Sequence, residues 1–209
     1  MVSDVTGNLF VIAAPSGAGK TSLVNALTES VAKLCISVSH TTRVARPSEV
    51  DGKDYFFVDH DTFDEMIERN AFLEYAIVFN QHYGTSRDWV MAELSIGNDV
   101  ILEIDWQGAR QVRRLFPDTI SIFILPPSME ALQERLERRQ QDNSATIVGR
   151  MQAAQDEMDH YREFDYLVIN DQFDLALQDL QHIVLSARVE TSIQAKRHAT
   201  LLANLLQKQ

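Results

Sequence analysis

Apolar runs and amphipathic segments alternate along this chain, and their order predicts a mixed α/β fold. Short runs of consecutive apolar residues, bounded by glycine, proline or polar turn residues, indicate strands that are covered on both faces of a parallel sheet. The predicted strands span residues 9–12, 33–40, 100–105, 119–125 and 166–170. Helical segments lie between them, so we expect a parallel sheet layered between helices.

Segments whose apolar residues recur at helical spacing follow most of these strands. The predicted helices span 21–32, 61–70, 87–97, a stretch after Gly108, 128–139, 145–162 and 174–207. Ser86, Ser128 and either Asp59 or Asp61 precede helices and have side chains suited to capping them. Two β-prone stretches, 53–58 and 71–79, do not fit the alternation, and residues 40–58 are interpreted as a small sheet excursion from the main core.

The composition narrows the class of protein. A chain of 209 residues can form one substantial core, and its formal charge of −11 argues against a general binder of nucleic acids or membrane surfaces. Any phosphate site must therefore be local. The single cysteine, Cys35, cannot form an internal disulfide and is interpreted as a structural thiol in a reducing compartment. Because the sequence has no signal-peptide pattern and no apolar run of membrane-spanning length, we expect a cytoplasmic protein.

The stretch that begins at Leu9, LFVIAAPSGAGKTSL, combines a buried strand, a glycine-rich loop and a helix. Its glycines allow successive backbone N–H groups to point into one concavity, and the helix N-terminus adds its positive dipole. Lys20 can reach the outer phosphates of a nucleotide, and the Thr21 hydroxyl can bind Mg²⁺. The stretch therefore predicts a P-loop, although Ala14 replaces the first glycine of the motif; the alternative is a glycine-rich turn with an exposed lysine.

Two groups of arginines are further candidates for binding phosphate. Arg43 and Arg46 lie in an irregular polar segment, and each guanidinium can form paired hydrogen bonds to phosphate oxygens. On spacing alone, a pair of solvated surface arginines is the better explanation. A second group, which includes Arg139 and Arg150, surrounds a polar loop near residue 141; these arginines either complement helix dipoles or close over a bound nucleotide.

Carboxylates end the predicted strand at 100–105, at the edge of the sheet where open α/β folds bind ligands. Because strand side chains alternate, Glu103 and Asp105 are expected to point to the same side. The spacing from Asp105 to Gly108 matches a short pattern of GTP hydrolases, but no Asn-Lys-x-Asp sequence follows, so this interpretation is rejected.

Several longer segments, in order along nearly the whole chain, resemble guanylate kinase, a nucleoside monophosphate kinase of bacterial type. The segments that carry the resemblance are AAPSGAGK at 13–20, SVSHTTRVARPSEVDGKDYFFV at 37–58, FLEYA at 72–76, HYGTS at 82–86, ILEIDWQGA at 101–109 and IFILPPS at 122–128.

The resemblance implies an α/β P-loop fold of three layers with an inserted GMP-binding subdomain and a small lid. It implies one domain over 1–209, with a core at 1–38, 89–134 and 151–209, the subdomain at 39–88 and the lid at 135–150. It also implies a phosphotransferase that converts ATP and GMP, or dGMP, into ADP and GDP, or dGDP, in purine nucleotide metabolism and GMP recycling. ATP and GMP are the expected partners, and Mg²⁺ is the expected cofactor. The sequence leaves a homo-oligomer open.

Roles for individual residues follow from the same resemblance. The implied ATP-binding residues are Ala14, Pro15, Ser16, Gly17, Ala18, Gly19, Lys20, Thr21 and Asn170. The implied GMP-binding residues are Ser39, Arg43, Arg46, Tyr55, Glu74, Tyr83, Thr85, Glu103 and Asp105. Catalysis is implied for Lys20, Arg43, Arg139 and Arg150, and Mg²⁺ binding for Thr21, with Glu103 acting through water.

The chain departs from the family pattern at a few of these positions. Glu103 stands where the family has either aspartate or glutamate, which shifts its contact by one methylene group. Arg138 and Gln140 stand where the family often has glycines, which puts the geometry of lid closure in question.

The hydrogen-bonding groups of guanine support the implied role of Glu74 in recognising this base. A carboxylate at Glu74 can accept hydrogen bonds from N1–H and the 2-amino group of guanine, whereas adenine offers an acceptor and no amine there. Such a site should discriminate about 10⁴-fold. Taken alone, the sequence around Glu74 favours a solvent-facing acid on a strand.

Two other functions stay open from the sequence. The first is a guanylate-kinase-like protein-interaction module without catalysis, although such modules typically lose the phosphate-loop residues that are present here. The second is a P-loop kinase for another phosphorylated acceptor.

Overall fold

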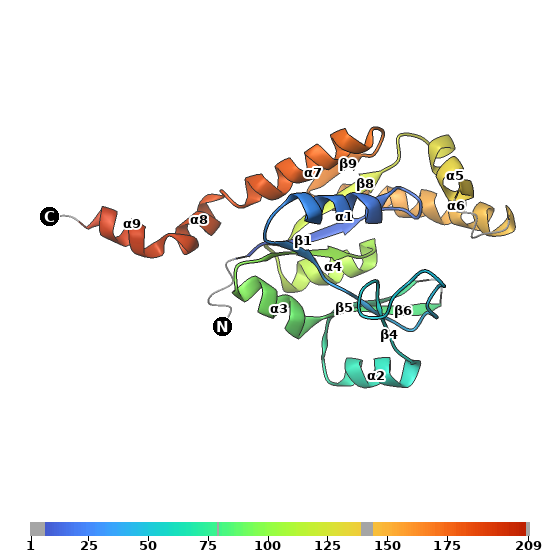
Figure 1. The fold of residues 1–209 in the computed structure, drawn as a ribbon, viewed down its shortest axis with the longest axis horizontal. Helices are drawn as coiled ribbons and strands as arrows, with labels where there is room; N and C mark the ends of the chain where they lie inside the picture. The colour runs from blue at the N-terminus through green and yellow to red at the C-terminus, as the bar shows by residue number, and fades with distance from the viewer. Residues whose placement is uncertain (1–6, 79, 139–143, 208–209) are drawn as a thin grey trace.

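The computed structural model describes residues 7–78, 80–138 and 144–207, and a parallel five-stranded sheet forms its centre (Figure 1). The strand order is β2-β7-β1-β8-β9, and every paired neighbour is parallel. The strands are β1 (Leu9–Ala13), β2 (Leu34–Ile36), β7 (Asp99–Glu103), β8 (Ile120–Leu125) and β9 (Tyr166–Ile169). The predicted α/β class with a parallel sheet core is confirmed.

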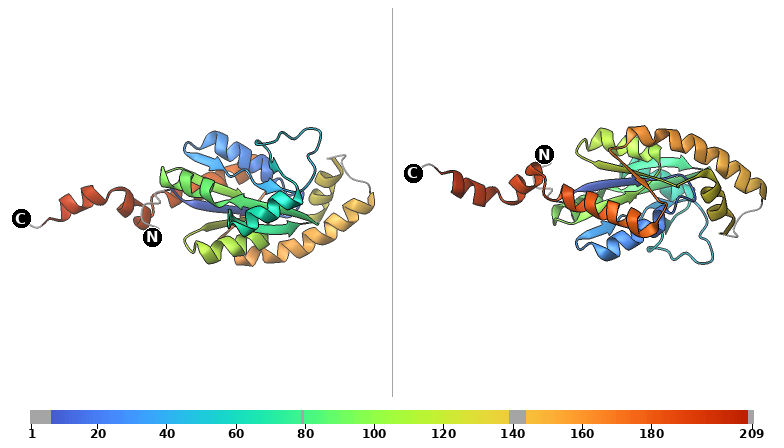
Figure 2. Two further views of the ribbon diagram at one scale, coloured as in Figure 1. Left: turned by 90° about the horizontal axis from the view of Figure 1, so that it is seen from below. Right: turned by 90° about the horizontal axis from the view of Figure 1, so that it is seen from above.

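Helices cover both faces of this sheet because successive strand side chains point to opposite faces. Phe10 and Ile12 of β1 pack with one cluster that includes side chains of α1 (Lys20–Ser30) and α7 (Phe173–Ala187). Their neighbours Leu9 and Val11 pack with the opposite cluster. The second cluster takes side chains from α3 (Arg87–Ser95) and α4 (Trp106–Leu115). The result is three layers, which are also visible in the views from below and from above (Figure 2).

A second, four-stranded sheet lies below the main sheet in Figure 1, in the order β4-β3-β6-β5. Its elements are β3 (His40–Thr41), β4 (Phe56–Phe57), α2 (His60–Glu68), β5 (Phe72–Val78) and β6 (Gln81–Ser86). The fully buried Phe63 of α2 stacks against Phe72 of β5, with ring centroids 4.5 Å apart, and thereby closes the sheet on one side. This sheet lies within the range predicted for an inserted subdomain.

Two expectations about this region were wrong. Residues 33–40 do not form one strand, because β2 pairs in the main sheet whereas β3 pairs in the second sheet, and the chain crosses from one to the other at 37–39. The strand β6 was not predicted, because Gln81–Ser86 is polar and contains Gly84. The small residue is needed at this point, since a Cβ there would lie 2.8 Å from the ring of Phe72.

Capping residues behave largely as the sequence indicates. Asp59 accepts a hydrogen bond from Thr62 N and caps α2, and Ser86 accepts one from Trp89 N and caps α3. Ser128 accepts one from Ala131 N at the start of α5 (Met129–Arg138). Asp105, predicted within a strand, caps α4 instead by accepting a hydrogen bond from Gly108 N.

The helices on either side of the predicted lid, α5 and α6 (Ser144–Met158), pack against each other at one end of the molecule (Figure 1). Leu132 and Leu136 of α5 contact Ala154 of α6 in a small cluster of their own. The 3-10 helix η1 (Asp159–Glu163) follows directly, so the predicted helix over 145–162 ends earlier than expected. In Figure 1 this helical pair lies beside the loop that precedes α1.

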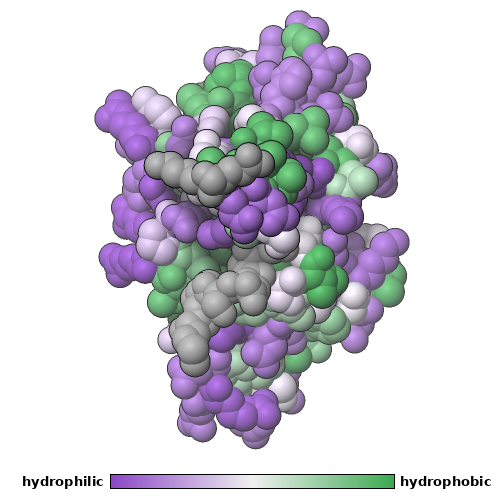
Figure 3. All heavy atoms as spheres, turned by 90° about the vertical axis from the view of Figure 1, so that its left-hand side faces the viewer, coloured by the Kyte–Doolittle hydropathy of each residue, from purple (hydrophilic) through white to green (hydrophobic). Residues whose placement is uncertain are grey.

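The C-terminal region is not the single helix predicted for 174–207. Instead α7 is followed by α8 (Thr191–Arg197) and α9 (Ala199–Leu206), neither of which has a buried residue. Arg188 anchors the end of α7, because its Nε lies 2.6 Å from the buried carboxylate of Asp99. Beyond this anchor, α8 and α9 extend away from the sheet as an arm (Figures 1 and 2). Figure 3 looks onto this end of the molecule and shows apolar and hydrophilic residues side by side on the surface.

Across the described residues, no helix has both the length and the apolar character needed to cross a membrane. The single cysteine, Cys35, is half-buried, and its Sγ lies 3.4 Å from the carbonyl of Asp99. Burial, together with the charge of Glu93, raises the pKa of Cys35 to about 11. The thiol is therefore protonated at neutral pH, as expected of a structural cysteine.

Candidate active site

The loop after β1 has the backbone that a phosphate cradle requires. Gly17 and Gly19 have φ angles of 93° and 91°, in the left-handed region that glycine adopts without strain. A Cβ at Gly19 would also lie 2.4 Å from Nδ2 of Asn170. Helix α1 begins at Lys20, directly after this loop, so its free N–H groups and positive dipole end face the same space.

Two side chains, one at the end of β9 and one from α5, hold the loop in place. Asn170, buried at the end of β9, donates from Nδ2 to the carbonyl of Ala18 at 2.7 Å. Arg135 of α5 donates to the same carbonyl at 3.3 Å and to the carbonyl of Asn170 at 2.8 Å. Asn170 was predicted to lie near the adenine, whereas the role of Arg135 was not predicted. Both line a cleft of about 310 Å³ beside Gly17 and Gly19.

Two adjoining clefts lie between the main sheet and the second sheet. They share Thr21, Ser39, Arg46, Tyr55 and Glu103 as lining residues. One, of about 300 Å³, brings most of the predicted donor-side residues together with predicted acceptor-side residues. The site residues predicted from the sequence that line this cleft are Ala14, Pro15, Ser16, Gly17, Gly19, Lys20, Thr21, Ser39, Arg46, Tyr55, Glu74, Tyr83, Glu103, Asp105 and Arg150.

The carboxyl end of β7 meets the start of α1 in this cleft. Register places Ile12 of β1 opposite Glu103, and the Thr21 hydroxyl donates to Oε1 of Glu103 at 2.5 Å. Lys20 donates from Nζ to the carbonyl of Ile104 at 3.2 Å. Asp105 also lines the cleft, although it does so as the cap of α4 rather than through strand alternation.

Glu74 and Thr85 form a buried pair on neighbouring strands of the second sheet. They are register partners in the antiparallel β5–β6 pair, and the Thr85 hydroxyl donates to Oε1 of Glu74 at 2.5 Å. Only 4% of Glu74 is exposed. Burial raises the pKa of Glu74 to about 7, with a smaller upward contribution from the charge of Asp105, although the bond from Thr85 opposes the shift. A buried carboxylate that faces a cleft and bonds to a neutral hydroxyl keeps capacity to accept hydrogen bonds from a ligand.

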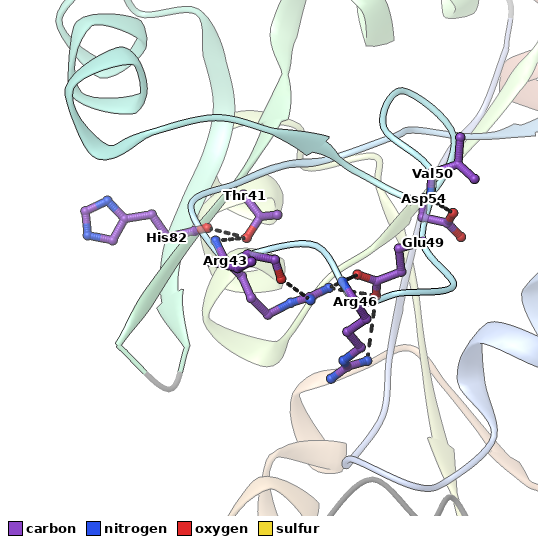
Figure 4. Close-up of polar contacts among 8 residues, drawn as sticks. Thr41, Arg43, Arg46, Glu49, Val50, Asp54 and His82 are labelled. Atoms are coloured by element: carbon purple, nitrogen blue, oxygen red, sulfur yellow. Dashed lines mark hydrogen bonds and ion pairs between the residues drawn. The ribbon is translucent and has the colours of Figure 1, made fainter.

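Arg43 and Tyr55 lie together beside the cleft. The Arg43 guanidinium lies 5.4 Å from the ring centroid of Tyr55, and it also bonds to Tyr83. Burial, and then the charge of Glu103, raises the pKa of Tyr55 to about 12, so its phenol remains a hydrogen-bond donor. Among the described residues, Arg43 does not line either cleft; its guanidinium bonds to Glu49, which lines one of them (Figure 4).

A further carboxylate faces the P-loop, and the sequence analysis missed it. Glu157 lines the cleft and accepts a hydrogen bond from Ser16 N–H. Burial raises its pKa, while Ser16 and the charge of Lys20 oppose the rise. Glu157 follows Arg150 by two helical turns of α6, so the two share one helix face. The spacing of Arg150 and Glu157 in the sequence could have indicated that Glu157 faces the same site.

The predicted lid residue Arg139 lies outside the described residues. Arg150 lies in α6 and lines the cleft with the P-loop. The base of α6 is fixed to α4 at η1, where His160 stacks on Trp106 with ring centroids 3.7 Å apart. Arg110 lies over the same Trp106 ring at 4.5 Å and pairs with Glu163 at 2.5 Å.

Within the described ranges, no group of three or more His, Cys, Asp or Glu side chains is arranged to hold a metal ion by itself. The pair formed by Thr21 and Glu103 supplies hydroxyl and carboxylate oxygens beside the P-loop. Mg²⁺ commonly takes one or two protein oxygens and completes its shell with phosphates and waters. The residues present therefore fit a metal that arrives with a nucleotide.

Comparisons with known proteins agree with this geometry. The family model described as guanylate kinase matches residues 6–187. The chain belongs to the guanylate kinase family. The guanylate kinase of Coxiella burnetii is 56% identical over 202 residues, which cover 97% of this chain and 98% of that protein. The guanylate kinase of Escherichia coli O157:H7 is 52% identical over 202 residues, with 96% and 98% covered.

A solved structure supports the same fold. The crystal structure of guanylate kinase from Anaplasma phagocytophilum superposes with a TM-score of 0.76 at 31% sequence identity, over 90% of this chain and 89% of that one. The membership in the family predicted from the sequence segments is thereby confirmed, together with the kinase class of enzyme.

Proposed function

We propose that this guanylate kinase transfers the terminal phosphoryl group of ATP to GMP or dGMP in the cleft between its two sheets, as a step of purine nucleotide metabolism and GMP recycling. The observation that carries the proposal is the placement of buried Glu74, with its partner Thr85, in the same cleft as Lys20 of the P-loop. A group that accepts hydrogen bonds from a base thus faces a group that neutralises phosphate.

On the donor side, the P-loop amides and Lys20 bind the β- and γ-phosphates of ATP. The cleft lined by Gly19, Arg135 and Asn170 takes the adenosine, because it opens directly beside the loop. Mg²⁺ accompanies the nucleotide, held on the protein by Thr21 and, through water, by Glu103. It supplies neutralisation of the phosphate charge that develops during transfer.

On the acceptor side, the ionised carboxylate of Glu74 accepts from N1–H and the 2-amino group of guanine, with Ser39, Thr85 and Asp105 nearby. Arg43, Arg46, Tyr55 and Tyr83 donate to the phosphate. AMP lacks both donors on its base, so it leaves the buried Glu74 without a partner and is rejected.

Transfer itself needs positioning and charge neutralisation rather than a covalent intermediate. We propose that the subdomain at 39–88 and the lid at 135–150 approach the core when both nucleotides bind. Arg139 and Arg150 then stabilise charge on the moving phosphoryl group, and closure excludes water.

A coupled assay of ADP release tests this proposal. ATP is offered with GMP, dGMP, AMP, UMP or a sugar bisphosphate at equal concentrations. We expect turnover with GMP and dGMP and at least about 10³-fold less with AMP. Faster turnover with another acceptor would assign the chain to a different substrate, and binding of GMP without ADP release would support the non-catalytic module instead.

We also propose that the enzyme is cytoplasmic and forms a homo-oligomer through its C-terminal arm, α8 and α9. Leu201, Leu205 and Leu206 of α9 are largely exposed. Residues 191–209 contain basic side chains and no Asp or Glu, while the whole chain carries −11, so a second copy offers a surface of complementary charge. Sedimentation of the full chain should show an oligomer that Leu205→Asp dissociates; a monomeric wild type at assay concentrations would contradict this.

A further inference from the structure

One carboxylate, Glu49, joins both arginines of the acceptor segment (Figure 4). Its two oxygens lie 2.8 and 3.0 Å from Nη2 of Arg43. Its Oε2 also accepts a hydrogen bond from the main-chain N–H of Arg46 at 2.8 Å, and its Oε1 lies 3.7 Å from Nη1 of the Arg46 side chain. No motif in the sequence analysis singled out Glu49.

The loop that carries Glu49 is itself fixed. Glu49 N donates to the carbonyl of Arg46 at 3.0 Å, and Val50 N donates to Oδ2 of Asp54 at 2.8 Å. Arg43 is further restrained, because its Nη1 donates to the carbonyl of Val44 at 2.9 Å. The side chains of Arg43 and Glu49 are only 19% and 13% exposed, so water does little to weaken their bond.

Glu49 stays charged in this setting. Burial works to raise its pKa, but the bonds from Arg43 and from Arg46 N–H outweigh burial and lower the pKa. A permanent negative charge between two guanidinium groups offsets their mutual repulsion, and it leaves a net positive charge for a phosphate to meet.

The bonds of Glu49 also distinguish a residue that positions the arginines from one that competes with the phosphate for them. A carboxylate that merely occupied the phosphate position would hold both guanidinium groups that GMP needs, whereas Glu49 bonds at hydrogen-bond distance to only one of them, the guanidinium of Arg43, through Nη2. Here the Arg46 side chain is 47% exposed and lines both clefts, while Glu49 binds Arg46 chiefly through its main-chain N–H. The guanidinium of Arg46 therefore remains accessible.

We propose that Glu49 is a positioning residue that fixes Arg43 and the main chain at Arg46 before GMP binds, so that the acceptor phosphate meets a preformed pair of arginines. The inference rests on the proposed phosphate-binding roles of Arg43 and Arg46. Preformation lowers the entropic cost of ordering the arginines at the moment of binding.

Glu49→Gln tests the proposal with little change of shape. We expect the KM for GMP to rise about tenfold or more, while kcat and the KM for ATP change less than about threefold, because the lost interaction serves binding of the acceptor phosphate. The inhibition constant of guanosine, which has no phosphate, should stay unchanged. Glu65→Gln, which removes an exposed carboxylate from α2 of the same subdomain, should match the wild type.

Each other outcome overturns the proposal. A lower or unchanged KM for GMP would show that Glu49 competes with the phosphate or has no effect on it. Equal weakening of GMP and guanosine would show a general structural role. Failure of the proposed function is distinguishable, because the wild-type protein itself would then release no ADP with GMP.

A double-mutant cycle adds an independent test. If Glu49 acts through Arg43, then Glu49→Gln should raise the KM for GMP less in an Arg43→Lys background than in the wild type. Equal fold-changes in the two backgrounds would contradict the proposed route.

Discussion

The P-loop and the acceptor subdomain solve similar binding problems with different parts of the chain. The P-loop presents main-chain N–H groups from one continuous segment, held by Asn170 and Arg135. The acceptor subdomain presents side chains from several short strands, and its polar groups already bond to one another, as in the Glu74–Thr85 pair. The first site depends on backbone shape, whereas the second depends on which side chains the fold brings together.

Two glutamates in the acceptor subdomain make the same point on a smaller scale. Glu74 has a raised pKa because burial outweighs the hydrogen bond that it accepts from the neutral hydroxyl of Thr85. Glu49 has a lowered pKa because an arginine and a main-chain N–H outweigh its burial. One residue type thus supplies a group with unused bonding capacity in one place and a fixed counter-charge in the other.

The largest expected effect is on the donor side. Lys20→Ala removes the charge that faces the outer phosphates, and we expect kcat to fall at least about 10³-fold, while the far-ultraviolet circular dichroism spectrum is unchanged. Arg114→Ala, which removes an exposed positive charge at the end of α4, serves as the control. Near-normal ADP release by Lys20→Ala would break the assignment of the donor site.

The next effect is on the acceptor side. Glu74→Gln keeps the shape but places an amide donor against the donors of guanine, so kcat/KM for GMP should fall about 10²-fold. The KM for ATP should remain within a factor of about two. A parallel loss for ATP would mean that the two regions are not separate sites.

The same variant should be more stable than the wild type, because an ionised Glu74 costs folding free energy. The folded-state pKa of about 7 lies above the unfolded value, so the cost is absent at pH below the unfolded pKa and grows until the pH exceeds 7. Glu74→Gln should gain about 2 kcal/mol more at pH 8 than at pH 5.5 in urea unfolding. A gain that does not grow with pH would refute the raised pKa.

A smaller effect is expected from Gly108→Ala. A Cβ at Gly108 would lie 2.6 Å from Oε2 of Glu74, and Thr85 restrains that carboxylate from the other side. We expect the KM for GMP to rise about tenfold with the KM for ATP unchanged, because only the position of the carboxylate shifts. Steady-state titration of each substrate in turn measures this, and unchanged GMP binding would show that Glu74 moves freely.

The sequence predicted the donor region well because its signals are local. The glycines, Lys20 and Thr21 are neighbours in the chain, and a strand and a helix flank them in the structure as expected. The long segments matched to a family likewise gave the fold class. The caps Ser86 and Ser128 were predicted for the same reason, since a cap acts within one helical turn.

What the sequence did not predict depends on contacts between distant segments. Strand β6 becomes a strand only because β3 and β5 pair with it on either side. Arg135 reaches the P-loop across 117 residues of chain. The position of Glu157 beside the P-loop also depends on segments far apart in the chain. Glu49 is an exception, because its partners lie three and six residues away and no motif singles it out. The C-terminal arm was predicted as one helix because apolar spacing alone does not show where a helix leaves the core.

The most direct test of the two facing sites is a crystal structure with a bisubstrate analogue in which five phosphates join adenosine to guanosine. We predict that the guanine bonds to Glu74 and Thr85, that the phosphates run between the P-loop and the Arg43–Arg46 pair, and that the adenine lies beside Asn170 and Arg135. A guanosine bound anywhere other than against Glu74 would contradict the account.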